Sequence, residues 1–360
     1  MAKKVFVSIV THNHAATIDG CIAALLEQKG FSTNTNLAIH VIDNSSEDQT
    51  PALLDKYAPE QISYLASRVN LGFSAANNIA VAKFLRSDYD LFLLLNPDLK
   101  LTPECLETLC SRVIEDNEVD FATPLLLQCD QDLNPLHPER IDSAGMILLK
   151  SLRHLDRGQG QLLESIYTEE CYVFGATGAC CLMKRSFIED MLLKGERHEN
   201  DLYKIYPELE VGSSERAPLL DEAFFAFRED ADLCWRAQLL GKNCLYFPKA
   251  QAYHLRRVNP QKRSKLPNLI NYLGVRNRFL LQLNNYAPLS YPTTIVTGLV
   301  MRNLIVLAAI MIRERSSLGA VRDIFYLFNR QRERHNLLLK MGAQHQKVLR
   351  WLKAESISIR

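Results

Sequence analysis

The feature that most constrains this chain is the alternation of apolar runs with amphipathic segments over its first hundred residues. Four apolar runs have the pattern of buried strands: 5–10, 37–42, 62–65 and 91–95. Helical patterns follow at 18–26 and 74–85. This alternation predicts a mostly parallel sheet with helices on both faces, and 360 residues that are 47% hydrophobic are enough to bury its core.

Three of the predicted strands end in polar clusters. The first is followed by Thr11-His12-Asn13, the second by Asp43-Asn44-Ser45-Ser46 and the fourth by Asn96-Pro97-Asp98. Parallel strands bring their carboxyl ends to one edge of a sheet, and ligands of such sheets bind there. Each cluster alone is equally typical of a turn or a helix cap. Three of them together favour a binding site.

A later segment, Asp221 to Leu233, places carboxylates after an aromatic run and at the start of a predicted helix. Its acids are Glu229, Asp230 and Asp232. Acidic residues in a first turn stabilise the helix through its dipole. A carboxyl group beside aromatic side chains also has a raised pKa, which suits a general base.

Charge is divided unevenly along the chain, although the net charge is only +1. From His254 onward there are 19 Lys and Arg but 4 Asp and Glu, whereas the preceding residues have a net charge of −14. Such a basic tail predicts contact with phosphate, on nucleic acid or on a membrane. The tail lacks interleaved aromatic residues and reader motifs, so we expect no nucleic-acid partner.

The nine cysteines are an odd number and form no Cys-x-x-Cys pair, and no signal peptide precedes Val5. We therefore expect reduced thiols, a cytoplasmic location and no zinc cluster.

Two regions have weaker patterns of apolar residues. Residues 128–173 are predicted to be loops with one strand at 146–149, and 194–217 to be a surface insertion.

Several ordered motifs occur together: Val10-Thr11-His12-Asn13, Val41-Ile42-Asp43-Asn44-Ser45-Ser46, Asn70-Leu71-Gly72-Phe73 with Asn77-Asn78, Leu94-Leu95-Asn96-Pro97-Asp98, Asp142-Ser143-Ala144-Gly145, Gly175 to Gly178, and Asp221 to Leu233. With these motifs the chain resembles an inverting family 2 glycosyltransferase of the rhamnosyltransferase-like branch, over about residues 4–285. The resemblance implies a GT-A nucleotide-diphosphosugar-binding fold. We expect a catalytic domain at 1–260 and a helical, basic C-terminal region at 261–360.

The resemblance also implies site residues. The nucleotide sugar would contact Thr11, Asn13, Asp43, Asn70, Gly72, Asn78 and Asn96. Asp230 would be the base that deprotonates the acceptor hydroxyl, with Glu229 and Asp232 as alternatives. Asp232 points away from Asp230 at helical spacing.

A divalent cation, Mg²⁺ or Mn²⁺, would neutralise the leaving diphosphate. The family motif is Asp-x-Asp, and Asn96 replaces its first acid and offers only a neutral amide or carbonyl. Asp98 is therefore the expected metal ligand. His254 is a second expected ligand, although a lone histidine is as often structural. Arg256 and Arg257 are expected to hold phosphate oxygens.

These expectations describe a transferase that moves L-rhamnose from dTDP-rhamnose to a glycan or polyprenyl-diphosphate-linked acceptor in cell-surface polysaccharide synthesis. A transferase for another hexose and a non-catalytic sugar-nucleotide-binding scaffold are the alternatives.

The most apolar segment, 294–312, is interrupted by Arg302 and Asn303. We expect it to lie peripherally on the cytoplasmic face of a membrane rather than to span it. The alternative is packing on the catalytic core or on another subunit of an oligomer.

Overall fold

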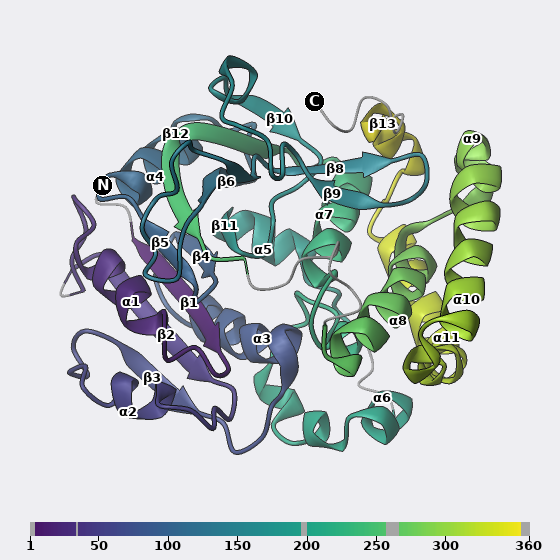
Figure 1. Cartoon of the computed structure of the whole chain (residues 1–360), viewed down its shortest axis with the longest axis horizontal. Helices are drawn as coiled ribbons and strands as arrows, with labels where there is room; N and C mark the ends of the chain where they lie inside the picture. Colours follow the sequence, from purple (N-terminus) through teal and green to yellow (C-terminus); the bar gives the residue numbers. More distant parts are fainter. Residues whose placement is uncertain (1–3, 34, 196–199, 257–265, 354–360) are drawn as a thin grey trace.

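A computed structural model describes residues 4–33, 35–195, 200–256 and 266–353. Its centre is a ten-stranded mixed sheet (Figure 1). The strands are β1 (Val5–Thr11), β2 (Leu37–Asp43), β3 (Ser63–Ala66), β4 (Leu91–Leu95), β5 (Leu99–Leu101), β6 (Phe121–Gln128), β7 (Ile141–Ser143), β10 (Cys171–Val173), β11 (Cys180–Lys184) and β12 (Cys244–His254). Their order is β10-β12-β6-β11-β4-β1-β2-β3, with β5 paired to β12 and β7 to β6.

The predicted parallel arrangement of the first strands is confirmed. Strand β1 pairs in parallel with β2 and β4, and β2 pairs in parallel with β3. Side chains of β1 alternate between two hydrophobic cores, with Phe6 and Val10 in one and Val5, Val7 and Ile9 in the other. Burial on both faces explains why these strands are continuous apolar runs in the sequence.

Helices cover both faces of the sheet. The core on one face includes α3 (Gly72–Leu85), α5 (Arg185–Met191) and α7 (Glu229–Leu240). The core on the other includes α1 (Ile18–Leu26), α2 (Thr50–Leu54) and α4 (Cys105–Glu115). This layered α/β architecture is the predicted fold class.

The region 128–173 contains more strand than predicted. The expected strand is present as β8 (Met146–Leu149), but β7 and β9 (His154–Asp156) are three-residue strands that the sequence pattern did not indicate. Strands β8 and β9 form a second sheet with β13 (Leu352–Lys353). Figure 1 shows this sheet reaching from the central sheet toward the C-terminal helices.

The described residues of 194–217, the predicted surface insertion, are mostly exposed or partly exposed, but they are more regular than the sequence pattern indicated. They form α6 (Asn200–Ile205) and two 3-10 helices, Pro207–Glu210 and Ser213–Glu215, in which Leu202 and Leu209 are buried. Arg216 makes a buried ion pair with Glu222, at 2.7 Å between Nε and Oε1. The few apolar residues of segment 194–217 are spaced too irregularly to show a helical period in the sequence. Tertiary packing nevertheless buries Leu202 and Leu209.

The C-terminal region packs on the N-terminal part, as one of the two alternatives predicted. It contains α8 (Asn268–Asn285), α9 (Pro292–Thr294), a π-helical segment (Ile295–Met301), α10 (Arg302–Ile312), α11 (Gly319–Lys340) and a 3-10 helix (His345–Trp351). Leu280, Leu281, Leu327 and Leu338 belong to the same hydrophobic core as α3 and α7. The described core is therefore continuous across the expected domain boundary.

A buried charged network also joins the two parts. Asp221 Oδ1 accepts a hydrogen bond from Arg330 Nη1 at 2.6 Å, and Asp221 Oδ2 lies 3.2 Å from Arg334 Nε. Both arginines are on α11. Asn284 of α8 donates to Asp221 and to Asp232 of α7, at 3.0 Å each. Burial opposes ionisation of Asp221, but the two guanidinium groups outweigh it and hold its pKa far below the usual range.

This network predicts that Asp221→Asn strongly destabilises the protein. The substitution keeps the shape but removes the carboxylate charge that pairs with two buried arginines, so we expect a loss of about 3 kcal/mol or more in unfolding free energy. Urea denaturation measures the effect. Asp88→Asn, which breaks the exposed Lys4–Asp88 pair, is the control and should leave the midpoint unchanged. An equal, small shift in both variants would contradict the network's importance.

Candidate active site

A cleft of about 1070 Å³ opens at the carboxyl ends of β1, β4 and β12. Its other walls are the β8–β9 hairpin, the start of α7, and helices α8 and α10. This volume lies at the upper end of the range for small-molecule sites and suits two substrates. It brings together most of the predicted site residues: Thr11, Asn13, Asn70, Gly72, Asn96, Asp98, Glu229, Asp230, His254 and Arg256.

One wall of the cleft follows β1 and β2. The Thr11 hydroxyl is buried and has no hydrogen-bond partner among the described residues, so it is available to a ligand. Asn44 lines the cleft and holds the 70s loop, accepting from Leu71 N at 2.7 Å and donating to Gly72 O at 3.0 Å.

Asp43 and Asn78 were expected to contact the nucleotide sugar, but they do not line the cleft. Asp43 is buried and accepts hydrogen bonds from the backbone and hydroxyl of Ser46, which fixes the turn after β2. Asn78 lies on the buried side of α3, where it bonds Leu220 through its amide oxygen and nitrogen, and Glu222 Oε1 at 3.1 Å. The structure thus gives Asn78 a structural role in place of the expected sugar contact.

Asp98 and His254 meet at the floor of the cleft. Antiparallel pairing of β12 with β5 sets His254 beside Leu99, and His254 Nε2 lies 3.4 Å from Asp98 Oδ1. The other ring nitrogen, Nδ1, is 2.7 Å from Asp142 Oδ2. Burial disfavours the charged imidazole, but Asp142 and Asp98 outweigh it and raise the pKa of His254 to about 10.

These residues fit a divalent cation that keeps open positions for other ligands. No group of three or more metal-ligating side chains occurs in the part of the chain that the structure describes. One carboxylate and one imidazole nevertheless face the cleft together. The imidazole is oriented by the buried carboxylate of Asp142, an arrangement typical of metal-binding histidines. Metal binding would displace the imidazole proton.

Arg256 does not have the role expected from the sequence. Its guanidinium bonds Asp142 (Nε to Oδ1, 2.6 Å) and Asp156 (Nη2 to Oδ2, 2.7 Å). It therefore neutralises two carboxylates rather than reaching first for phosphate oxygens. Burial raises the pKa of Asp142, but His254 and Arg256 lower it further, to about 2. Arg257, the other arginine expected to hold phosphate, lies outside the described residues.

The start of α7 presents Asp230 to the cleft. Its Oδ2 accepts from Gly178 N at 2.9 Å and its Oδ1 from Ala231 N at 2.7 Å. Burial raises the pKa of Asp230, although these backbone hydrogen bonds oppose the shift. Close packing here requires glycine, because a Cβ on Gly175 would lie 2.3 Å from Cys234 Sγ.

The two alternative bases are placed differently. Glu229 lines the cleft but is buried, and burial and the neighbouring Asp230 raise its pKa well above the usual value. Asp232 is fully buried outside the cleft lining and pairs with Arg236 at 2.9 Å. Asp230 is thus the least buried of the three acids.

The loop before α7 has an unusual backbone that α8 holds in place. Phe225, Phe227 and Arg228 have positive φ angles of 62°, 70° and 74°. Asn277 Nδ2 lies 2.8 Å from the carbonyls of Phe224, Ala226 and Phe227, and Arg276 Nη2 lies 2.6 Å from that of Ala223. Such conformations persist only where neighbours fix them.

Gly72 meets this loop so closely that it accepts no side chain. Its φ is +73° and an added Cβ would lie 2.5 Å from Phe225 O. Gly72→Ala should displace the loop and lower catalytic turnover by about 100-fold, as misplacement by an ångström does. Gly160→Ala is the matched control, since Gly160 has φ +78° and no atom within 4 Å. Steady-state kinetics compare them, and equal activities would exclude a positioning role.

Sequence reasoning missed several residues that line the cleft or lie behind its lining. Asp142 belongs to a quoted motif but received no role, and Asp156, His154 and Arg153 lie in or beside the unpredicted strand β9. Arg278 of α8 lies in the C-terminal region that was predicted to be helical and basic, and the basic composition gave this arginine no particular role. Their only signal in the sequence is that their side chains are charged or polar.

The fold is that of GT-A glycosyltransferases. GalNAc-T7, solved with UDP, GalNAc and Mn²⁺, has a TM-score of 0.56 at 14% identity, and the match covers 91% of this chain and 57% of that structure. TarS of S. aureus has a TM-score of 0.51 at 13% identity, covering 96% of this chain and 54% of TarS. The chain thus spans somewhat more than half of each.

Sequence comparison specifies the family within that class. Residues 6–192 match the model of glycosyl transferase family 2. Rhamnosyltransferase WbbL of Escherichia coli (strain K12) is 25% identical over 255 residues, which are 69% of this chain and 83% of WbbL. The chain belongs to glycosyltransferase family 2, is similar to a member of its rhamnosyltransferase-like branch, and is an enzyme that transfers sugar from a nucleotide sugar.

Proposed function

We propose that the enzyme transfers L-rhamnose from dTDP-rhamnose, with inversion, to a hydroxyl of a glycan or polyprenyl-diphosphate-linked acceptor in cell-surface polysaccharide synthesis. The similarity to WbbL supports the sugar. One observation carries the chemistry: Asp230 faces the same cleft as the Asp98–His254 pair. A donor bound in this cleft would have the base beside its sugar and the Asp98–His254 pair beside its diphosphate.

In the proposed reaction, the acceptor oxygen attacks the anomeric carbon and the bond from that carbon to the diphosphate oxygen breaks. The hydroxyl proton passes to a carboxylate oxygen of Asp230, and the nucleoside diphosphate leaves from the opposite face. Attack opposite the leaving group inverts the anomeric centre. The raised pKa of Asp230 makes it a stronger base than an exposed aspartate.

Asp98 and His254 would hold a divalent cation, and the Mn²⁺ in the GalNAc-T7 structure supports this assignment. When bound, the cation supplies positive charge that stabilises the departing diphosphate. Asp142 keeps the His254 ring in orientation through its 2.7 Å contact with Nδ1. The orphaned Thr11 hydroxyl and the amide of Asn96 are the polar contacts we assign to the donor.

The Asp230→Asn variant tests this proposal. With dTDP-rhamnose we expect kcat to fall by about 100- to 10,000-fold while nucleotide binding persists. Wild-type kcat should rise with pH through the pKa of Asp230, above the usual aspartate value, because the base acts only when deprotonated. Glu229→Gln is the comparison and should retain more activity.

Intact turnover in Asp230→Asn would contradict the assigned base. Wild-type protein that binds nucleotide sugars without turnover, with Mg²⁺ or Mn²⁺ present, would instead support the non-catalytic scaffold. Turnover of UDP-glucose but not dTDP-rhamnose would support the alternative hexose.

We also propose peripheral contact with the cytoplasmic face of a membrane through the continuous helix Pro292–Ile312. This helix, 21 residues long, is apolar and long enough to cross a membrane. Arg302 lines the cleft and Asn303 bonds Gln282 and Arg278. These polar residues therefore face the protein.

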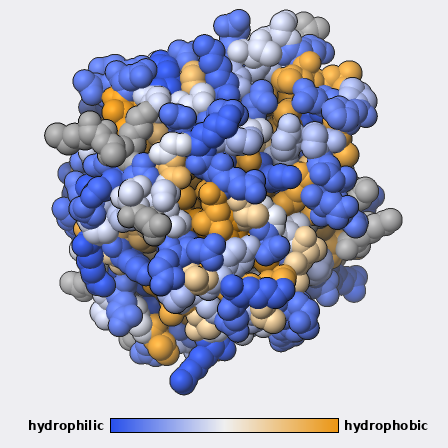
Figure 2. Space-filling model, turned by 90° about the vertical axis from the view of Figure 1, so that its left-hand side faces the viewer, coloured by the Kyte–Doolittle hydropathy of each residue, from blue (hydrophilic) through white to orange (hydrophobic). Residues whose placement is uncertain are grey.

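The outer face of the helix is apolar. It exposes Val296, Val300, Met301, Leu304, Met311 and Ile312. Figure 2 shows the opposite side of the molecule, where hydrophilic residues cover most of the surface. An exposed apolar face with Arg313 and Arg315 at its end suits the interface of an anionic bilayer.

A double substitution, Val300→Asp with Leu304→Asp, should abolish flotation with anionic liposomes because it places charge within the apolar contact. Val211→Asp is the control, since Val211 is 76% exposed outside this face. Wild-type protein recovered only in the unbound fraction, or loss of flotation in the control as well, would contradict the proposed contact.

A further inference from the structure

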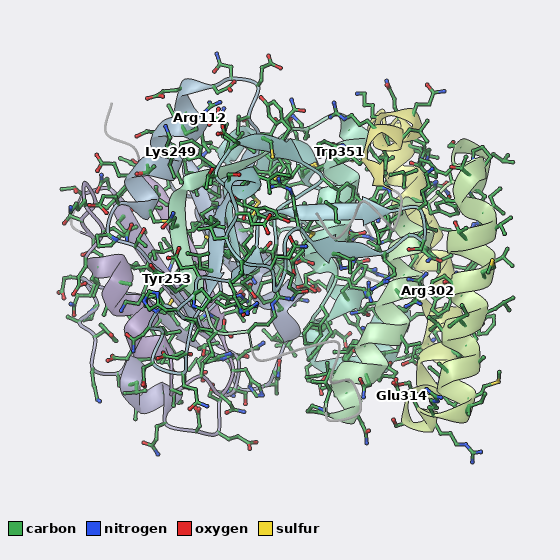
Figure 3. All side chains as sticks on the ribbon, turned by 45° about the horizontal axis from the view of Figure 1, so that its top comes forward. Arg112, Lys249, Tyr253, Arg302, Glu314 and Trp351 are labelled. Atoms are coloured by element: carbon green, nitrogen blue, oxygen red, sulfur yellow. The ribbon has the colours of Figure 1, made fainter. Side chains whose placement is uncertain are left out.

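The far end of the cleft carries four arginines from four different segments. They are Arg153 before β9, Arg228 before α7, Arg278 on α8 and Arg302 on α10. Figure 3 labels Arg302 on the long outer helix, with Glu314 beyond the C-terminal end of the same helix. The sequence separation of these arginines shows that the fold assembles the cluster.

Arg278 is held rigidly by neutral partners. It is only 5% exposed, its Nε donates to Asn303 Oδ1 at 2.9 Å, and its Nη2 lies 3.4 Å from Ser151 O. The side chain of Arg153 has no hydrogen bond or ion pair within the described part of the chain. A buried guanidinium with neutral partners retains its full charge toward the cleft.

The positive charges of the cluster act on one another. Burial lowers the pKa of Arg278 to about 9, together with the charges of Arg228, Arg302 and Arg153. The same surroundings lower the pKa of His154, which lies 3.4 Å from Arg228. The nearby acid Asp156 is bonded to Arg256 instead. An anion placed among these arginines would relieve their repulsion.

The wall beside the arginines is apolar. Ile270 and Val275 of α8 face the cleft, as do Ile305, Val306 and Ile310 of α10. Ile305 is 55% exposed although it lines a cleft. A ligand that satisfies both surfaces has an anionic group joined to a hydrocarbon chain.

We propose that the four-arginine cluster binds the phosphate or diphosphate group of a lipid-linked acceptor, with its hydrocarbon chain along α10. Arginine suits this group because its guanidinium binds phosphate oxygens bidentately. Arg228 directly precedes Glu229 and Asp230, so the bound acceptor lies on the side of the base. The inference rests on the proposed function and adds a second anion site, separate from the donor diphosphate at Asp98 and His254.

Farnesyl diphosphate, below its micelle concentration, is the probe, and titration calorimetry with the full chain measures its binding. We expect binding in the presence of saturating dTDP and Mg²⁺, and about tenfold weaker binding by Arg153→Gln. Arg86→Gln removes an exposed arginine on α3's C-terminal end, remote from the cleft lining, and should bind as wild type. Inorganic pyrophosphate and farnesol test the two halves of the ligand and should each bind more weakly.

Displacement of the probe by dTDP, or equal affinity in Arg153→Gln and wild type, would overturn the second site. Pyrophosphate binding as tightly as farnesyl diphosphate would overturn the lipid part. Hydrolysis of the donor without acceptor separates this inference from the proposed function. Suppose that Arg153→Gln retains that hydrolysis and that wild-type protein does not bind farnesyl diphosphate. The acceptor site would then be excluded, whereas the proposed transferase chemistry would not be.

Discussion

The hydrogen bond from Gly178 N to Asp230 Oδ2 connects the two halves of the site. It joins the N-terminus of α7 to the segment before β11, at the sheet edge where β1 and β4 also end. This contact helps to fix the distance between the acid on α7 and the residues that follow the parallel strands. The glycine-rich segment 175–178 is needed because a side chain at Gly175 would overlap Cys234.

The C-terminal helices take part in building the site. Helix α8 binds the carbonyls of residues 223–227 through Arg276 and Asn277, and α11 neutralises Asp221 at the start of the same segment. The positive-φ backbone before α7 is therefore held from behind by buried charged and amide groups. The basic composition of this region thus has two uses: some arginines hold the loop, and others line the cleft.

Much of the fold was predictable because its signals are local. Continuous apolar runs identify β1, β2 and β4, and the polar residues after them lie at one edge, as parallel topology requires. The exact function of each polar residue was not predictable. Asn78 belongs to the same sequence motif as Asn70. It nevertheless faces Leu220 and Glu222, which lie more than 140 residues later in the sequence. Strand β9 is only three residues long, which is too short for an alternating pattern, so Asp156 and Arg153 had no periodic signal.

The most direct test of the convergence of Asp98, His254 and Asp230 is a crystal structure with Mn²⁺ and an unreactive dTDP-rhamnose analogue. Anomalous scattering locates the manganese independently of the protein atoms. We predict the ion in contact with Asp98 and His254 and bridging the diphosphate, with the anomeric carbon facing Asp230. Manganese bound elsewhere, or a sugar with its reactive carbon turned away from Asp230, would contradict the account.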